Sequence, residues 1–132
     1  MNSWYNEESK FCMLCNVEES IEHYFKQCIF VADFWKMFFQ WWTEKSNCIL
    51  NLGTIDIIFG VMNEINDCVI GVLNYCILFA KRYINSCRLN NKRCNFENYL
   101  EKLNKRIFIE MYISEINGML EAFNKKWYFV LP

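Results

Sequence analysis

The sequence is poor in proline, glycine and histidine. Its 132 residues include one proline, four glycines and a single histidine, whereas 54% are hydrophobic and 18% are aromatic. A disordered chain has few aromatic residues and low hydrophobicity, so this composition indicates a folded protein. The length suits one domain, or one small domain with an appendage, with enough apolar side chains to form a buried core.

Long uninterrupted apolar segments are also missing. The stretch 29–42 contains Asp33, Lys36 and Gln40, and the stretch 69–80 is too short to span a bilayer. The first residues do not place a charged segment before an apolar one, as a signal peptide would. We therefore expect an intracellular protein, cytoplasmic or nuclear, with no membrane partner.

Recognisable catalytic motifs are absent. The sequence has no Gly-rich phosphate loop, no HExxH, no GxSxG and no adjacent pair of aspartates. The single histidine limits acid–base chemistry further. We predict that the chain is not an enzyme and contains no catalytic residues.

Charge is distributed unevenly along the chain. Residues 1–70 have a net charge of −6, because four Lys or Arg face ten Asp or Glu, whereas residues 71–132 have a net charge of +5. Such a basic zone is able to neutralise nucleic-acid phosphates. The alternative is a solvated helical face with ion pairs. The candidate nucleic-acid contacts are Lys81, Arg82, Arg88, Lys92, Arg93, Lys102, Lys105 and Arg106.

The hydrophobic pattern predicts a mainly α fold. Residues 2–14 suggest a small turn or hairpin, and the acids of 18–22 suit a helix start. Apolar residues at helical spacing predict helices up to about residue 43, from 63 to about 89, and from 96 onward. The last helix would begin at the cap Asn95 and run for up to about 30 residues, with Gly118 as a tolerated weak point. Residues 46–60 form a connector.

We group these elements into two segments that pack as one domain. Residues 1–45 would hold a zinc knuckle and an aromatic helix, and residues 46–132 the connector and the long helices. Trp35, Phe38, Trp41 and Trp42 are expected in the core, whereas Trp4, Tyr5, Phe11 and Tyr24 are the better candidates for base stacking.

Four residues near the N-terminus have metal-ligand spacing. They follow the pattern Cys12-x2-Cys15-x7-His23-x4-Cys28, which contains the only histidine. Three sulfurs and one imidazole nitrogen suit a structural Zn²⁺, whereas Mg²⁺ and Ca²⁺ prefer oxygen ligands. The alternative is three ordinary buried cysteines and a surface histidine. The complete array favours one structural zinc ion.

The remaining cysteines lack such spacing. We expect Cys48, Cys68, Cys76, Cys87 and Cys94 to be core residues or incidental surface thiols.

This segment resembles that of a known family. The string CMLCNVEESIEHYFKQC from Cys12 to Cys28, followed by Phe34-Trp35, is similar to the zinc-binding segment C-terminal to the polymerase in non-LTR (LINE-type) retrotransposon reverse transcriptases. That segment combines a cysteine pair, a Glu-Ser/Thr stretch, His-x-Phe-x-x-Cys and a later Phe-Trp. Three later stretches are similar to the tail that follows it, at residues 56–60, 81–84 and 123–127.

The resemblance implies binding of the element's RNA or of target DNA during target-primed reverse transcription. The partners would be RNA or DNA and the polymerase part of a reverse transcriptase. This chain lacks the Tyr/Phe-x-Asp-Asp motif and an endonuclease motif, so the catalytic parts would lie upstream on a longer polyprotein or be lost. The x7 spacing departs from the x4 spacing of retroviral nucleocapsid knuckles, so their sequence-specific binding does not carry over.

Two alternatives to nucleic-acid binding follow from the same residues. The knuckle could be a staple for an interaction module whose aromatic helix docks on the polymerase or on a second copy. The chain could also be an inactive remnant of a retroelement. Salt-dependent binding of RNA or DNA favours the first function, and self-association without such binding favours the interaction module.

Overall fold

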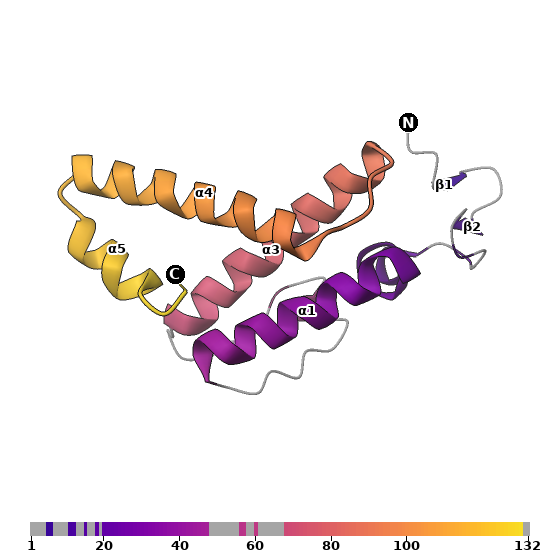
Figure 1. Ribbon diagram of the computed structural model, residues 1–132, viewed down its shortest axis with the longest axis horizontal. Helices are drawn as coiled ribbons and strands as arrows, with labels where there is room; N and C mark the ends of the chain where they lie inside the picture. Colours follow the sequence, from indigo (N-terminus) through magenta and orange to yellow (C-terminus); the bar gives the residue numbers. More distant parts are fainter. Residues whose placement is uncertain are drawn as a thin grey trace.

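The structure is a computed structural model, and it describes residues 5–6, 11–12, 15, 18, 20–47, 56–57, 60 and 68–130. As predicted, the described part is mainly helical, with a small Cys/His cluster near the N-terminus (Figure 1). The main elements are β1 (Tyr5–Asn6), β2 (Phe11–Cys12), the π-helical turn η1 (His23–Gln27), α1 (Ile29–Ser46), α3 (Cys68–Leu89), α4 (Phe96–Ile116) and α5 (Leu120–Trp127).

The N-terminal hairpin forms where the sequence predicts it. Strands β1 and β2 are antiparallel, with Tyr5 opposite Cys12 and Asn6 opposite Phe11. The second strand therefore ends on a cysteine of the metal-ligand pattern.

Helix α1 is separated from the preceding helical turn at Cys28. Its backbone is extended, with φ −61° and ψ 135°, so the helix cannot continue through this residue. The Cys28 amide still donates to the carbonyl of His23. At its other end α1 stops at Asn47, which adopts a left-handed conformation with φ 57°.

Helices α3 and α4 are joined by a short polar loop. Asn95 caps α4, as predicted, because its side chain accepts a hydrogen bond from the Asn98 amide at 3.1 Å. Residues 63–67, where the sequence predicts the start of α3, lie outside the described residues. The same holds for most of the connector 46–60, of which Asp56 and Ile57 are helical.

The prediction of one continuous C-terminal helix is wrong. The chain leaves α4 at Asn117, and Gly118 adopts a left-handed conformation with φ 71°. The amides of Gly118 and Met119 donate to the carbonyls of Glu115 and Ser114, which is the Schellman pattern of a helix end. This turn lets α5 fold back toward α3.

An aromatic cluster forms the centre of the core. Phe34 of α1 lies 5.2 Å from Tyr99 of α4 and 5.8 Å from Tyr83 of α3, measured between ring centroids. The Tyr99 hydroxyl donates to the Cys76 carbonyl at 2.8 Å, which satisfies a fully buried polar group. At the far end, Trp127 of α5 packs against Tyr75 of α3 at 5.2 Å.

The predicted core aromatics of α1 are largely confirmed. Trp35, Phe38 and Trp42 are buried, whereas Trp41 is half-buried at the edge of the same cluster. The face of α1 that carries these side chains therefore packs inside the core of the chain itself. No helix in the described part of the chain is long and apolar enough to cross a membrane.

Candidate functional site

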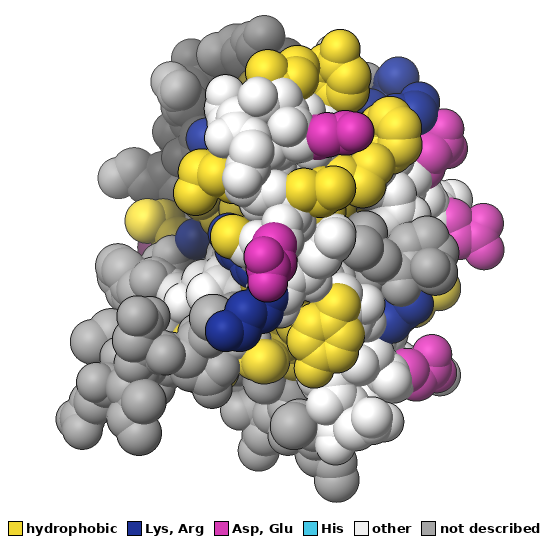
Figure 2. Space-filling model, turned by 90° about the vertical axis from the view of Figure 1, so that its left-hand side faces the viewer, with side chains coloured by type: hydrophobic (Ala, Val, Ile, Leu, Met, Phe, Trp, Pro, Cys, Tyr) yellow, Lys and Arg dark blue, Asp and Glu magenta, His cyan; other side chains and the backbone are white. Residues whose placement is uncertain are grey.

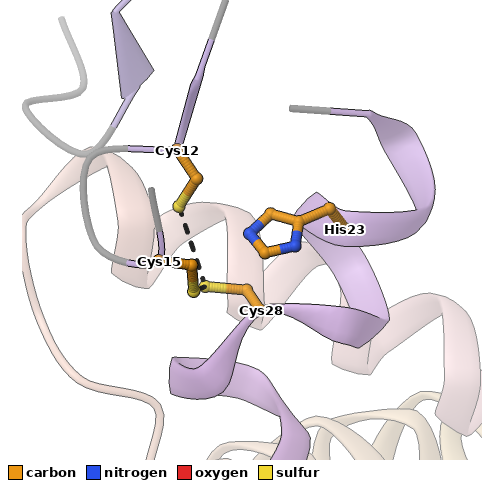
Figure 3. A group of neighbouring side chains, drawn as sticks. All are labelled: Cys12, Cys15, His23 and Cys28. Atoms are coloured by element: carbon orange, nitrogen blue, oxygen red, sulfur yellow. Dashed lines mark hydrogen bonds between the residues drawn. The ribbon is translucent and has the colours of Figure 1, made fainter. Parts of the chain in front are cut away.

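Three local structures bring the four predicted ligands together. Cys12 ends β2, Cys15 lies in the turn that follows, His23 begins η1, and Cys28 stands at the break before α1. Figure 3 shows their side chains pointing toward one another. Their ligand atoms all lie within 4.8 Å of one another. The Cys28 sulfur is 3.5 Å from that of Cys15 and 4.0 Å from that of Cys12, and the three cysteines are free thiols.

The cluster is shielded from solvent. Cys12 and Cys28 are fully buried, and His23 is only 4% exposed. Within the described part of the chain, the His23 Nε2 atom has no hydrogen-bond partner. A buried polar atom without a partner is costly, so a ligand from outside the chain would stabilise this nitrogen.

The Cys28 thiol has the protonation behaviour of a buried group. Burial raises the pKa of Cys28 to about 12, so this thiol is protonated at neutral pH without a cation. Metal binding must therefore displace its proton, since the thiolate is the ligand. The Ile29 amide donates to the Cys15 sulfur at 3.4 Å, which adds a donor directed at the cluster. These four residues are placed to bind a metal ion.

Arg88 connects this cluster to helix α3. Its side chain is fully buried, its Nε atom donates to the Tyr24 carbonyl at 3.1 Å, and its guanidinium carbon lies 4.2 Å from the centre of the Tyr24 ring. Its charge also lowers the pKa of Cys28, although burial has the larger, opposite effect. Arg88 therefore holds η1 against α3, and its buried guanidinium is not at the surface where a phosphate would reach it.

The other predicted basic residues lie on or near the surface. Lys81 is half-buried on α3, and burial lowers its pKa. Lys105 pairs with Glu101 one helical turn away, at 3.4 Å, and both side chains are well exposed. The remaining five are exposed on α3, the α3–α4 loop and α4, namely Arg82, Lys92, Arg93, Lys102 and Arg106.

Three of these cations converge on one cavity. It has a volume of about 260 Å³, lies between α3 and the start of α4, and is lined by Arg82, Lys92 and Lys102. Arg82 lies on α3, Lys92 in the α3–α4 loop and Lys102 on α4. The spacing of these residues in the sequence therefore does not indicate that they meet. The part of α3 that lines the cavity also contacts η1, through Arg88 and Tyr24. In Figure 1 this end of α3 lies on the same side of the molecule as β1 and β2.

The predicted stacking residues are only partly described. The side chains of Trp4, Tyr5 and Phe11 lie outside the described residues. Tyr24 is half-buried beneath the Arg88 guanidinium, and its hydroxyl donates to Asn85 of α3 at 2.7 Å. Its ring therefore serves mainly to join the N-terminal segment to α3.

Cys87 has an environment that the sequence does not reveal. A hydrogen bond with Cys94 lowers the pKa of Cys87, a second one with Tyr83 lowers it further, and the charges of Lys102 and Lys92 act in the same direction. Cys76, in contrast, is fully buried, and burial raises its pKa to about 12. The side chains of Cys48 and Cys68 lie outside the described residues.

Comparison with known proteins adds no identification. No protein-family model, curated protein sequence or solved structure matches this chain.

Proposed function

We propose that this chain is a non-catalytic nucleic-acid-binding domain stabilised by one structural zinc ion. The proposal for the metal rests on the donor set and its spacing. For a tetrahedral site with Zn–S bonds of about 2.3 Å, the sulfur atoms should lie about 3.8 Å apart. The two sulfur–sulfur distances, 3.5 and 4.0 Å, fall on either side of that value. Four protein ligands leave no open position, which favours a structural ion over a catalytic one.

Charge balance supports zinc at this place. A Zn²⁺ ion with three thiolates and a neutral imidazole has a net charge of −1. A buried charge needs a compensating partner, and the buried guanidinium of Arg88 supplies a positive charge that acts on Cys28. The zinc centre and the end of α3 would then stabilise each other.

Nucleic-acid binding is supported mainly by the convergence of Arg82, Lys92 and Lys102 on one cavity. The neighbouring Arg93 lies over the Phe30 ring of α1, with 5.3 Å between its guanidinium carbon and the ring centre. The loop between α3 and α4 is thus in contact with the helix that follows the metal ligands. Zinc would hold the basic surface in shape rather than contact the nucleic acid itself.

The resemblance to non-LTR retrotransposon reverse transcriptases gives this binding a role. In that role the chain assists target-primed reverse transcription by holding the element's RNA or the target DNA. The polymerase and nuclease would be other parts of a longer protein.

The experiment is a salt titration of nucleic-acid affinity. The zinc-loaded, reduced chain is titrated into a fluorescein-labelled RNA, and the logarithm of the affinity should fall linearly with the logarithm of salt concentration. The double variant Lys92→Glu/Arg93→Glu should weaken binding and flatten that slope, because it reverses two exposed charges at the basic surface. The matched control, Lys36→Glu/Lys125→Glu, changes the net charge equally at exposed positions on α1 and α5.

The outcomes decide the proposal. Equal losses in the two variants would show only a general effect of net charge and would contradict a specific basic surface. No affinity for RNA or DNA at low salt would overturn the function. Retention of metal by Cys28→Ser, measured by elemental mass spectrometry, would overturn the zinc site.

A second candidate function is self-association through α4. Apolar side chains along the second half of this helix are exposed, and Figure 2 shows hydrophobic side chains between charged ones at the α4–α5 end. Exposed apolar patches of this kind mark interaction surfaces. The patch consists of Phe108, Ile109, Tyr112, Ile113, Ile116 and Met119.

Charge along α4 favours a second copy of the chain as the partner. The first half of the helix carries Lys102, Lys105 and Arg106 together with Glu97 and Glu101, a net charge of +1, and the second half carries Glu110 and Glu115, a net charge of −2. An antiparallel α4–α4 contact therefore places halves of opposite net charge together. The aromatic face of α1, expected above to make this contact, is buried in the core.

Sedimentation equilibrium tests this second function. Self-association should be weakened by Tyr112→Glu and unaffected by Met37→Glu, a change at an exposed apolar position of α1. A monomer at all concentrations would overturn it.

A further inference from the structure

Two hollows of different chemistry lie on either side of Arg82. One is the cavity between α3 and α4 described above. The other has a volume of about 370 Å³ and lies between η1 and α3, where Ile21, Phe25 and Leu78 form its apolar part. Arg82 lines both hollows, and Lys81 lines the second. The two hollows are thus adjacent along the surface of α3.

The cavity between α3 and α4 suits a phosphate group. Its lining includes three cations and no acidic residue, and the polar side chains of Ser86, Asn90 and Asn98 complete it. The pKa of Cys87, in the same wall, is lowered mainly by its hydrogen bond with Cys94, and the charges of Lys102 and Lys92 act in the same direction. An oxyanion would be stabilised by the same charges.

The hollow between η1 and α3 suits a flat apolar ring. Leu78 is 51% exposed and Ile21 is 63% exposed, so apolar surface is open to solvent next to two cations. The half-buried ring of Phe25 is held in place by an edge contact with Tyr24, with 4.8 Å between ring centres. Nucleobases stack on aromatic and apolar side chains of this type while cations bind the adjoining backbone.

We propose that a single nucleic-acid strand crosses α3 at Arg82, with one phosphate in the cavity between α3 and α4 and a neighbouring base against Phe25 and Leu78. This inference rests on the proposed nucleic-acid binding and specifies its substrate. A duplex keeps its bases stacked and paired inside the helix, so its bases do not reach the apolar hollow. The domain therefore binds unpaired strands, such as an RNA loop or an exposed DNA end, more tightly than duplex.

Fluorescence anisotropy with two probes tests this assignment. The probes are a fluorescein-labelled oligothymidylate and the same strand paired with oligoadenylate, each titrated with the zinc-loaded full chain at one salt concentration. The single strand should bind more tightly than the duplex. Leu78→Asn should weaken single-strand binding about five-fold or more, since stacking contributes at least about 1 kcal/mol per base. It should leave duplex binding unchanged.

Matched variants separate this site from general effects. Met37→Asn makes the same kind of change at an exposed apolar position of α1 and should not alter binding of either probe. Arg82→Ala should weaken single-strand binding more than Lys125→Ala, which removes one exposed charge from α5. Inorganic phosphate at constant ionic strength should compete with the single strand in the wild type and compete less well in Arg82→Ala.

The failure of this inference is distinguishable from failure of the proposed function. Equal affinity for the two probes, or equal effects of Leu78→Asn and Met37→Asn, overturns the strand path while nucleic-acid binding stands. Competition by phosphate with no stacking effect shows an anion site without a base site and also overturns the path. Binding of neither probe at low salt overturns both proposals.

Discussion

Arg88→Met is the substitution that most directly tests the link between the Cys/His cluster and the helical core. Methionine fills much of the same volume without a charge or a hydrogen-bond donor. The change removes the bond from Nε to the Tyr24 carbonyl and the stacking of the guanidinium on the Tyr24 ring. It also removes the positive charge that acts on Cys28.

The expected effect of Arg88→Met on the free energy of unfolding depends on whether metal is bound. A hydrogen bond from a charged donor contributes about 1.5–3 kcal/mol and a desolvated cation–π contact about 2 kcal/mol. Burial of the guanidinium costs several kcal/mol and offsets most of this. In the metal-free chain, where the raised pKa keeps Cys28 neutral, we therefore expect a change of about 1 kcal/mol or less in the free energy of unfolding.

With zinc bound, Arg88→Met should destabilise the protein more than it does in the metal-free chain. The buried centre then has a net charge of −1, and Arg88 is the buried cation that compensates it. Loss of a residue that supports metal ligands typically lowers metal affinity about 10- to 100-fold. We expect Arg88→Met to weaken zinc binding by that factor, equivalent to about 1.4–2.8 kcal/mol.

A competition titration against a chromophoric chelator measures the zinc affinity, and circular dichroism confirms that the variants are folded. Arg88→Lys keeps the charge and should retain most of the affinity. Arg93→Met, at an exposed position over Phe30, is the control for loss of a charge elsewhere. If folded Arg88→Met binds zinc as tightly as the wild type, the charge-compensation argument is wrong.

Three further predictions concern the metal centre, a thiol and the core. His23→Ala should remove metal binding and amide-exchange protection in residues 20–28 while α3 and α4 stay protected, and uniform protection would contradict a structural metal. Iodoacetamide labelling of Cys87, followed by mass spectrometry, should rise at lower pH than labelling of an ordinary cysteine because its thiolate is favoured, whereas Cys76 stays unlabelled; a Cys87 midpoint at or above pH 9 would refute this. Leu103→Ala, at a fully buried site, should cost about 2–5 kcal/mol in urea unfolding, and a loss below about 1 kcal/mol would refute its place in the core.

The sequence alone predicted the helical class and the four Cys and His residues that are placed together to bind a metal ion. Short-range information was sufficient for both, because an amphipathic helix repeats every 3.6 residues and a cysteine knuckle has fixed local spacing. The cap at Asn95 was predictable for the same reason, since it acts on an amide three residues away.

Tertiary structure decided where the C-terminal helix ends and which charges face solvent. Helix propensity alone would allow a glycine at position 118 within a continuous helix. In the structure Gly118 instead adopts a left-handed conformation with φ 71°, and the resulting turn is favoured because it allows Phe123 and Trp127 to be buried in the core. Arg88 has the same local signature as its exposed neighbours. It is buried because Tyr24, 64 positions earlier in the chain, covers its guanidinium.

Local spacing therefore determined the helical class and the four Cys and His residues that are placed to bind a metal ion, and packing between distant segments determined the surface. The meeting of Arg82, Lys92 and Lys102 at one cavity depends on the angle between α3 and α4, which the shared aromatic core sets. No periodic pattern within one segment encodes that angle, because it arises from side chains of three helices packing together.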